Sequence, residues 1–199
     1  MVYIRVPRPL WIAVPTVALI VAVAGLQIGL PVYRRQQARQ TINRLRGRVD
    51  TVRFGPDWFR ELVGKERARS LDAVRWLCLD GARVTDADLT VICTQMSLEE
   101  LIMGHTPITD VDLEQIGRLH GLRKLVLQET PITNAGLAHL GNLEELKVLD
   151  LSFTSIGDEG LRHLAALKKL ERLGLAETSV TDAGAADLQR ALPGLKIER

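Results

Sequence analysis

The chain has 199 residues, a formal net charge of +2 at pH 7, two cysteines, and 46% apolar against 25% charged residues. These bulk values are typical of an ordinary soluble domain and leave the redox compartment open. No GxSxG motif, glycine-rich phosphate loop or HExxH motif is present, so the sequence predicts no catalysis and no cofactor. Acidic and basic residues are mixed after residue 74, without the basic stripe that a phosphate backbone requires, which argues against nucleic acid as a partner.

The N-terminal part differs from these averages. After a basic flank at residues 1–9, residues 10–32 form a run of 23 residues without a charge. As a helix this run is about 34 Å long, enough to cross a hydrocarbon core of about 30 Å with some tilt. Trp11 lies at one end and Tyr33 just beyond the other, where aromatic rings favour the membrane interface. We therefore expect a single transmembrane helix or signal anchor at residues 10–32.

A cleaved secretory signal is the alternative interpretation of this segment. Arg5 and Arg8 form a basic start, and a small-residue Ala-Val-Ala site ends at Ala24, before Gly25. Cleavage there makes the remaining chain a periplasmic or secreted structural protein of the envelope. The apolar run continues for eight residues past that site, which favours the uncleaved anchor.

Basic residues indicate the orientation of an uncleaved anchor. Two arginines precede the span, whereas seven follow it between residues 34 and 53, with Asp50 as the only acid among them. The positive-inside rule then places the C-terminal side in the cytoplasm, as a single-pass protein of the cell inner membrane. Gly25 and Gly29 form a GxxxG pair within the span, a spacing that lets two such helices pack closely as a homodimer.

A basic juxtamembrane helix is expected at residues 33–47. Within it, Ala38, Ile42 and Leu45 recur at helical spacing, and Gly47 is a suitable C-cap. The arginines of this helix either attract anionic lipid headgroups or serve only as a stop-transfer flank.

Residues 48–73 are expected to cap the first repeat. Residues 48–54 have the pattern of a short strand, 55–57 that of a turn, and 58–63 that of a short helix. Trp58 and Phe59 lie just before the first repeat, where a solenoid exposes an apolar edge. We therefore interpret them as packing residues rather than as a ligand-binding pair.

Residues 74–199 consist of copies of one 24-residue unit followed by a short C-terminal cap. Successive copies begin at Val74, Leu98, Leu122, Leu146 and Leu170, with a partial copy displaced by one residue at Leu195. Apolar residues first alternate, as in a strand, and later recur every three residues, as on one face of a short helix. A polar turn between them usually contains a threonine before an Asp or Asn, residues typical of a helix start. Each copy is predicted to be strand, turn and helix, and the copies to stack as a solenoid.

A second threonine column follows the strands, at Thr106, Thr130, Thr154 and Thr178. Stacked hydroxyls at this position are expected to satisfy the backbone of the loop as the chain leaves the sheet. Ala82 takes the position in the first copy, which indicates an atypical end repeat.

The pattern LxxLxLxxTxITDxGLxxLxxLxx resembles the leucine-rich repeat, in the subtype common in bacterial repeat proteins, and covers roughly residues 74–197. The resemblance implies an α/β solenoid with a curved parallel sheet on the concave side and helices on the convex side. It also implies recognition of a protein or peptide by the concave sheet, and no chemistry of its own.

From the strand columns we predict a partner-binding surface on the concave side, formed by Trp76, Glu100, Ile102, Lys124, Val126, Gln128, Asp150, Ser152 and Arg172. Its aliphatic centre ringed by polar groups suits a protein contact, although the charged neighbours can instead pair with one another across strands. Five strands make a face only about 20 Å wide, so a single copy should bind a peptide or loop weakly. Membrane anchoring would raise the effective concentration. A further alternative is an adaptor that selects substrates for a separate enzyme.

No metal site is expected. Cys78 should point outward from a strand and Cys93 lie on the helical side of the same repeat, too divergent for a disulfide or a metal pair. His139 is expected on the convex surface and needs no metal to explain it. Paired acids at helix starts, such as Asp86 with Asp88, are attributed to the helix dipole rather than to calcium.

Overall fold

A computed structural model describes residues 30–53, 56–57, 60–61, 64, 72–93 and 98–199. Most of the expected span at residues 10–32 lies outside these ranges, as do the Gly25 and Gly29 pair and the expected packing residues Trp58 and Phe59. Within the described ranges, no helix combines the length and the apolar character needed to cross a membrane.

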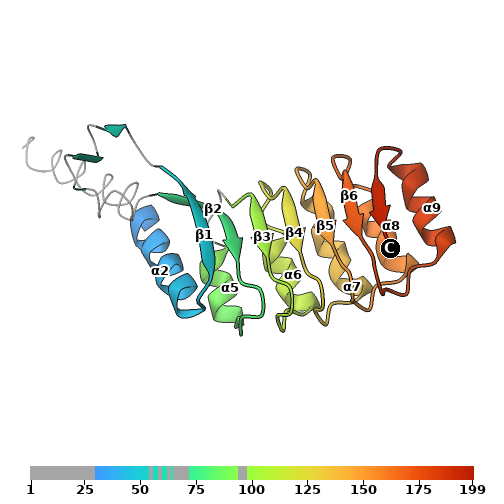
Figure 1. Cartoon of the computed structure of the whole chain (residues 1–199), viewed down its shortest axis with the longest axis horizontal. Coiled ribbons are helices and arrows are strands. Elements are labelled where there is room, and N and C mark those ends of the chain that lie inside the picture. The colour runs from blue at the N-terminus through green and yellow to red at the C-terminus, as the bar shows by residue number, and fades with distance from the viewer. Residues whose placement is uncertain (1–29, 54–55, 58–59, 62–63, 65–71, 94–97) are drawn as a thin grey trace, which may run out of the picture.

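The described strands form one seven-stranded sheet in chain order, which occupies one side of an elongated solenoid (Figure 1). The strands are β1 (Arg48–Val52), β2 (Ala73–Cys78), β3 (Glu100–Ile102), β4 (Lys124–Val126), β5 (Val148–Asp150), β6 (Arg172–Gly174) and β7 (Lys196–Glu198). Strands β2 to β7 pair in parallel, and β1 pairs antiparallel with β2. The sequence predicted a face of five strands. That prediction is wrong, because β1 and β7 add one strand at each end of the sheet.

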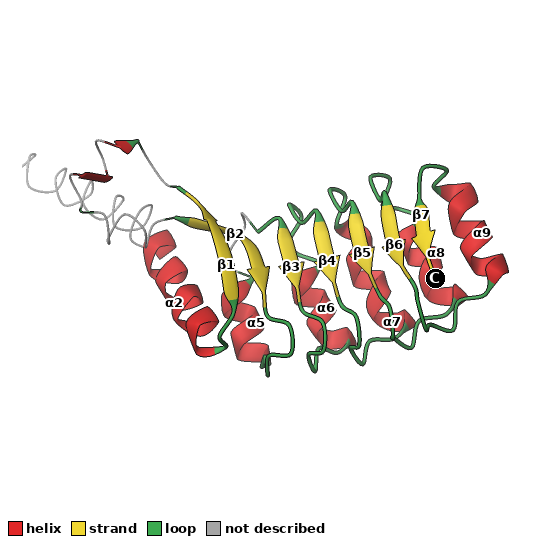
Figure 2. Cartoon of the chain, in the orientation of Figure 1, coloured by secondary structure: helices red, strands yellow, loops and turns green. Residues whose placement is uncertain are grey.

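The helices lie on the opposite side of the sheet (Figure 2). They are α2 (Leu30–Arg44), α5 (Asp86–Ile92), α6 (Asp110–Ile116), α7 (Asn134–Leu137), the 3-10 helix η2 (Ala138–Asn142), α8 (Asp158–Leu164) and α9 (Asp182–Ala191). The alternation of strand and helix along residues 73–191 confirms the predicted α/β repeat unit.

The hydrophobic core lies between these two layers. The inward leucine of each of the strands β2 to β6 is at most 1% exposed, at Leu77, Leu101, Leu125, Leu149 and Leu173. Full burial of a leucine stabilises a fold by about 2 kcal/mol, and consecutive repeats add their leucines to one continuous column. The core therefore holds the strands in the register that the 24-residue period predicts.

The threonine column at the strand exits has the expected role. Its hydroxyls donate to the carbonyl three residues earlier, with O···O distances of 2.5 to 2.8 Å at Thr106, Thr130, Thr154 and Thr178. In the first repeat the backbone N–H of Ala82 donates to the Leu79 carbonyl instead, at 2.9 Å. The accepting carbonyl is satisfied in every repeat, which is necessary because the residue that carries it is buried, at Leu79, Met103, Leu127, Leu151 and Leu175.

The first two repeats cap their helices from within the repeat. Asp88 Oδ2 accepts hydrogen bonds from the N–H of Thr85 at 3.1 Å and from its Oγ1 at 2.8 Å, and Asp112 does the same for Thr109 at 2.9 and 2.9 Å. The sequence interpretation attributed these acids to the helix dipole alone. That explanation is incomplete, because the acids also accept hydrogen bonds from the groups that begin each helix.

Later repeats are capped by a side chain of the preceding repeat. The donor and acceptor pairs are Thr133 with Asp110, Gly157 with Asn134, and Thr181 with Asp158, at N···O distances of 2.7, 2.8 and 2.8 Å. The accepting side chain lies over the first turn of the next helix. At the third residue of that helix, a glycine stands in place of the acid, Asp88 or Asp112, of the first two repeats. At Gly160, for example, a Cβ atom would lie 2.6 Å from Asn134 Oδ1.

The N-terminal end of the solenoid is covered by α2, which packs against α5. Ala38 and Ile42 of α2 are at most 1% exposed, and Arg44 forms an ion pair with buried Asp88. The basic helix therefore belongs to the folded core. Its expected C-cap is displaced by one residue, because Arg46 adopts the left-handed conformation at φ 55° while the N–H of Gly47 donates to the Ile42 carbonyl.

Candidate protein-binding surface

Two rows of side chains cross the sheet on the face opposite the leucine core. The entrance row lies where the parallel strands begin and consists of Asp50, Trp76, Glu100, Lys124, Val148, Arg172 and Lys196. The middle row lies two residues further along and consists of Arg48, Cys78, Ile102, Val126, Asp150, Gly174 and Glu198. The strand pairing confirms the register predicted from the repeat and brings the predicted residues of these two rows onto one face.

Gln128 and Ser152 of the predicted surface follow the strands, at the exit side of the sheet. Both are half-buried, Gln128 beside Gly104 of one neighbouring repeat and Ser152 beside Gly174 of another. The sequence interpretation missed Arg48, Asp50, Lys196 and Glu198, which β1 and β7 add to the ends of the two rows. The partial last copy, displaced by one residue, could have predicted that Lys196 joins the entrance row. Nothing in the repeat predicts the position of Asp50.

Aliphatic side chains form the centre of this face. Ile102, Val126 and Val148 are half-buried, whereas the intervening leucines are fully buried. Cys78 occupies the outward strand position that the sequence predicts, but it is only 5% exposed, and Nη2 of Arg48 lies 3.5 Å from its Sγ. The face therefore has a small apolar centre with charged side chains at its two ends.

Ion pairs between repeats lie one residue before the entrance row. Glu99 pairs with Arg75 at 3.0 Å and with Arg123 at 3.6 Å, and Lys147 pairs with Glu171 at 2.7 Å. The hydrogen bond from Lys147 holds the pKa of Glu171 below its ordinary value. These pairs tie neighbouring repeats together outside the two rows.

The charges of the two rows themselves are not paired in this way. Across the described ranges, neither Glu100 nor Lys124 nor Arg172 makes an ion pair, although Glu100 and Lys124 are directly opposite on β3 and β4. Pairing across strands, the alternative explanation for these charges, is therefore not what the structure shows. The charges remain available to a second molecule.

A rim of residues with positive φ borders the exit side of the sheet. The same position of successive repeats is left-handed at Gly81, His105, Glu129, Phe153 and Glu177, with φ between 51° and 68°. His105 bridges neighbouring repeats, with Nδ1 and Nε2 each 3.1 Å from a carboxylate oxygen, of Asp80 and of Glu129 respectively. The hydrogen bond to Asp80 and the charge of Glu129 raise the pKa of His105. Phe153 is 54% exposed on this rim.

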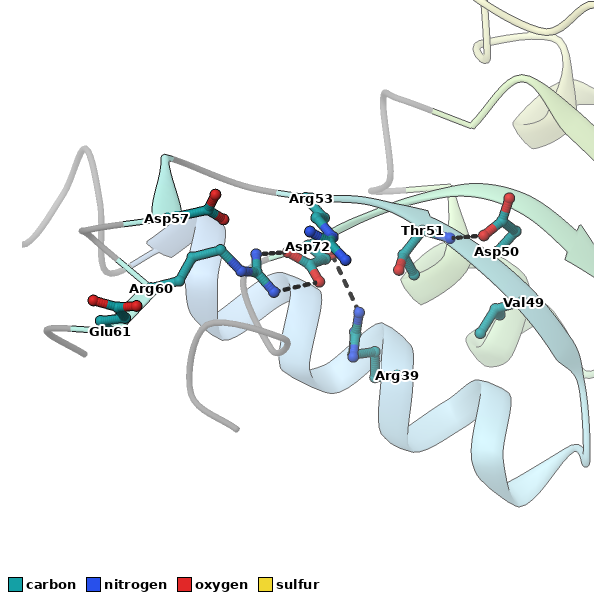
Figure 3. A pocket seen from close by; sticks show the side chains of 9 residues that line it. All are labelled: Arg39, Val49, Asp50, Thr51, Arg53, Asp57, Arg60, Glu61 and Asp72. Carbon is teal, nitrogen blue, oxygen red and sulfur yellow. Dashed lines mark hydrogen bonds and ion pairs between the residues drawn. The ribbon is translucent and has the colours of Figure 1, made fainter. Parts of the chain in front are cut away.

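A cavity of about 720 Å³ lies at the N-terminal end, between α2, β1 and the residues that precede β2 (Figure 3). Asp72 is buried there, with Oδ1 2.6 Å from Nη1 of Arg60 and Oδ2 3.3 Å from Nη2. Nη2 of Arg39 donates to the Asp72 carbonyl at 3.4 Å. This pairing raises the pKa of Arg60. The hydrogen bond from Arg39 joins α2 to the residue before β2, and the Arg60–Asp72 ion pair lies beside it, so these contacts act as a structural tie at this end of the sheet.

The thiols and acids do not form a metal site in the described part of the chain. Cys78 and Cys93 are both free, and no group of three His, Cys, Asp or Glu residues in these ranges is placed to hold a metal ion. Burial raises the pKa of the Cys93 thiol to about 12.

Comparisons with known proteins agree with the repeated unit. Residues 145–165 match the family model described as Leucine Rich repeat, and the same strand and helix recur on both sides of this match. Residues 145–165 are therefore similar to a leucine-rich repeat, and proteins built of such repeats are typically non-catalytic binding modules. A search of curated proteins finds no match.

Two solved structures are similar to part of the chain. A leucine-rich repeat protein of Leptospira interrogans matches at 21% identity and a TM-score of 0.45, covering 59% of this chain and 28% of that one. An internalin of Listeria monocytogenes matches at 22% identity and a TM-score of 0.40, covering 55% of this chain and 36% of that one. The chain thus spans about a third of the length of these proteins or less.

Proposed function

We propose that this protein is a membrane-anchored recognition module that holds a partner protein or peptide on its concave sheet, without turnover. The main support is the set of concave charges that have no ion pair within the described residues, arranged around Ile102, Val126 and Val148. A half-buried face with an aliphatic centre and unpaired charges suits a contact that a second molecule completes.

Photo-crosslinking from the full chain in native membranes tests this proposal. A photoreactive residue at Val126 lies on the concave face, and one at exposed Ala138 lies on the helical side of the same repeat as a matched control. We expect a protein adduct from Val126, absent from Ala138 and lost when Trp76→Ala, Lys124→Glu and Arg172→Glu are combined. Equal adducts from both positions, or an adduct that survives the triple substitution, would show that the surface is wrong.

The anchor in this proposal is the uncharged run at residues 10–32, in the inner membrane with the repeats in the cytoplasm. Its support is the length of the run and the seven arginines that follow it. Protease protection of a C-terminally tagged chain in spheroplasts, with the mass of the fragment recorded, tests the orientation. We expect protection until permeabilisation and a mass that begins at Met1 or Val2. Digestion in intact spheroplasts, or a start at Gly25, places the repeats outside the cytoplasm.

Pairing of two anchors through Gly25 and Gly29 is part of the same proposal. Replacing both glycines by leucine should abolish crosslinked dimers in native membranes while leaving the amount of inserted protein unchanged. Dimers that persist in this variant argue against pairing through this face.

A further inference from the structure

One end of the entrance row offers a site for a cation. Trp76 is directly opposite Asp50 on β1 and Glu100 on β3, so an acidic residue flanks it on each side. Oδ1 of Asp50 also accepts the N–H of Thr51, at 2.8 Å. Among the described residues neither carboxylate makes an ion pair, and Trp76 is half-buried. Indole is the best ring for a cation–π contact, and flanking carboxylates add charge-assisted hydrogen bonds. A lysine or arginine side chain of a partner fits this end.

The other end of the row has the opposite charge. Arg172 on β6 and Lys196 on β7 are exposed and directly opposite each other, with Lys124 two strands away. Like charges opposite each other on paired strands are unfavourable, and no acid in the described ranges forms an ion pair with either of them. An acidic side chain of a partner relieves this repulsion.

The dimensions of the face favour an extended segment over a globular surface. Six strand spacings of about 4.8 Å make the face about 29 Å long, and three positions along each strand make it about 13 Å wide. The product, about 380 Å², is less than half of the roughly 800 Å² per partner in a standard interface. The aliphatic centre of Ile102, Val126 and Val148 is also too small for the full apolar stripe of a helix.

We propose that the partner of this face is an extended peptide segment with a basic residue over Trp76, an acidic residue over Arg172 and an aliphatic residue between them. Four strand spacings separate β2 from β6, about 19 Å, which an extended chain covers in about six residues. The recognised pattern is therefore a pair of opposite charges about six residues apart around a Val, Ile or Leu. This inference rests on the concave face being the binding surface.

Binding of synthetic peptides to the full chain in non-ionic detergent tests the pattern by fluorescence anisotropy. The probe is a labelled nonapeptide with Lys and Glu six residues apart and Val midway between them. Matched controls replace the charged pair by two Lys or by two Glu, and a longer helix-forming peptide places Lys and Glu thirteen residues apart. We expect the mixed-charge nonapeptide to bind at least about tenfold more tightly than each control.

Reversing one end of the row should exchange this preference. The variant Asp50→Lys/Glu100→Lys is expected to prefer the two-Glu peptide, and Arg172→Glu/Lys196→Glu the two-Lys peptide. Gained binding in each variant excludes misfolding as the cause of the change. The matched control, Glu144→Lys/Glu159→Lys, alters exposed charges outside the concave face and should keep the wild-type preference.

Four results overturn this inference. Equal affinity for all nonapeptides, or a preference that the reversals leave unchanged, shows that the charge pattern is not read. Tighter binding of the helix-forming peptide shows that the segment is not extended. Concentration-dependent self-association that either reversal abolishes shows that a second copy occupies the face. If Val126 yields a protein adduct in membranes but the synthetic peptides bind with equal affinity, the proposed charge pattern is refuted and the proposed binding function is not.

Discussion

Replacing Gly160 by alanine tests how the repeats are joined at their helix starts. The added Cβ would lie 2.6 Å from Asn134 Oδ1, 3.1 Å from Leu137 Cδ1 and 3.2 Å from Asn134 Cα. The Asn134 oxygen accepts the N–H of Gly157, the N-cap of α8, at 2.8 Å. The amide of Asn134 has to move away from the new methyl group, and this hydrogen bond between repeats is lost.

The expected cost follows from three contributions. Loss of the hydrogen bond removes about 1 kcal/mol, and crowding against the buried Leu137 and the Asn134 backbone adds about 1 to 2 kcal/mol. Alanine is favoured over glycine in a helix by about 1 kcal/mol, which offsets part of this loss. The free energy of unfolding should therefore fall by about 1 to 2 kcal/mol, which for a chain of this size lowers the melting temperature by about 2 to 8 °C.

Thermal and urea unfolding of the full chain in mild detergent, followed by circular dichroism, measures this change. Gly141→Ala is the matched control, because its nearest contact is the His163 carbonyl oxygen at an ordinary 3.6 Å. That substitution should be neutral or stabilise by up to about 1 kcal/mol. In a background of Asn134→Ala, the cost of Gly160→Ala should shrink by about 1 kcal/mol. If Gly160→Ala stabilises as Gly141→Ala does, the contact between the repeats is wrong.

Three further predictions concern the core, the rim and a thiol. Leu149→Ala, at a site with 0% exposure in the middle of the solenoid, should lower the free energy of unfolding by about 2 to 5 kcal/mol in urea denaturation. The pKa of His105 is raised, so its bridge to Asp80 and Glu129 contributes stability that is complete below about pH 6.5 and disappears as the pH rises through the raised pKa. The wild-type protein should therefore have a higher melting temperature than His105→Gln at pH 5.5 and the same melting temperature at pH 9. An NMR titration that gives His105 a pKa at or below its ordinary value would contradict this prediction. The raised pKa of Cys93, about 12, predicts alkylation by iodoacetamide at pH 8 that is much slower in the folded than in the urea-unfolded chain, as mass spectrometry of the modified peptide can show.

Repetition explains why much of the fold is readable from the sequence. Equivalent residues of successive copies, such as Leu101 and Leu125, must occupy equivalent places, so aligning the copies is the same operation as aligning the strands. The threonine hydroxyls could be assigned for the same reason, because each acts on a carbonyl three residues away in its own turn. Local geometry repeated at a fixed period needs no knowledge of distant contacts.

Segments outside the repeat could not be placed in this way. No second copy exists against which to align Arg48–Val52, and the choice of its partner depends on the exposed edge of the first repeat. The position of Asp50 beside Trp76, and with it the cation site, therefore required the tertiary structure. The same holds for the packing of α2, because the sequence did not show that Ala38 and Ile42 are part of the core.

The sequence by itself determined the period of the repeat, the register of the parallel strands and the face on which the predicted binding residues lie. The tertiary structure decided which charges are already paired, which acids cap the next repeat, and how far the sheet extends beyond the repeats. Side-chain pairing depends on distances of a few ångströms between separate copies. A periodic pattern places such residues on one face, and only their packing shows whether Glu100 contacts Lys124 or remains available to a partner.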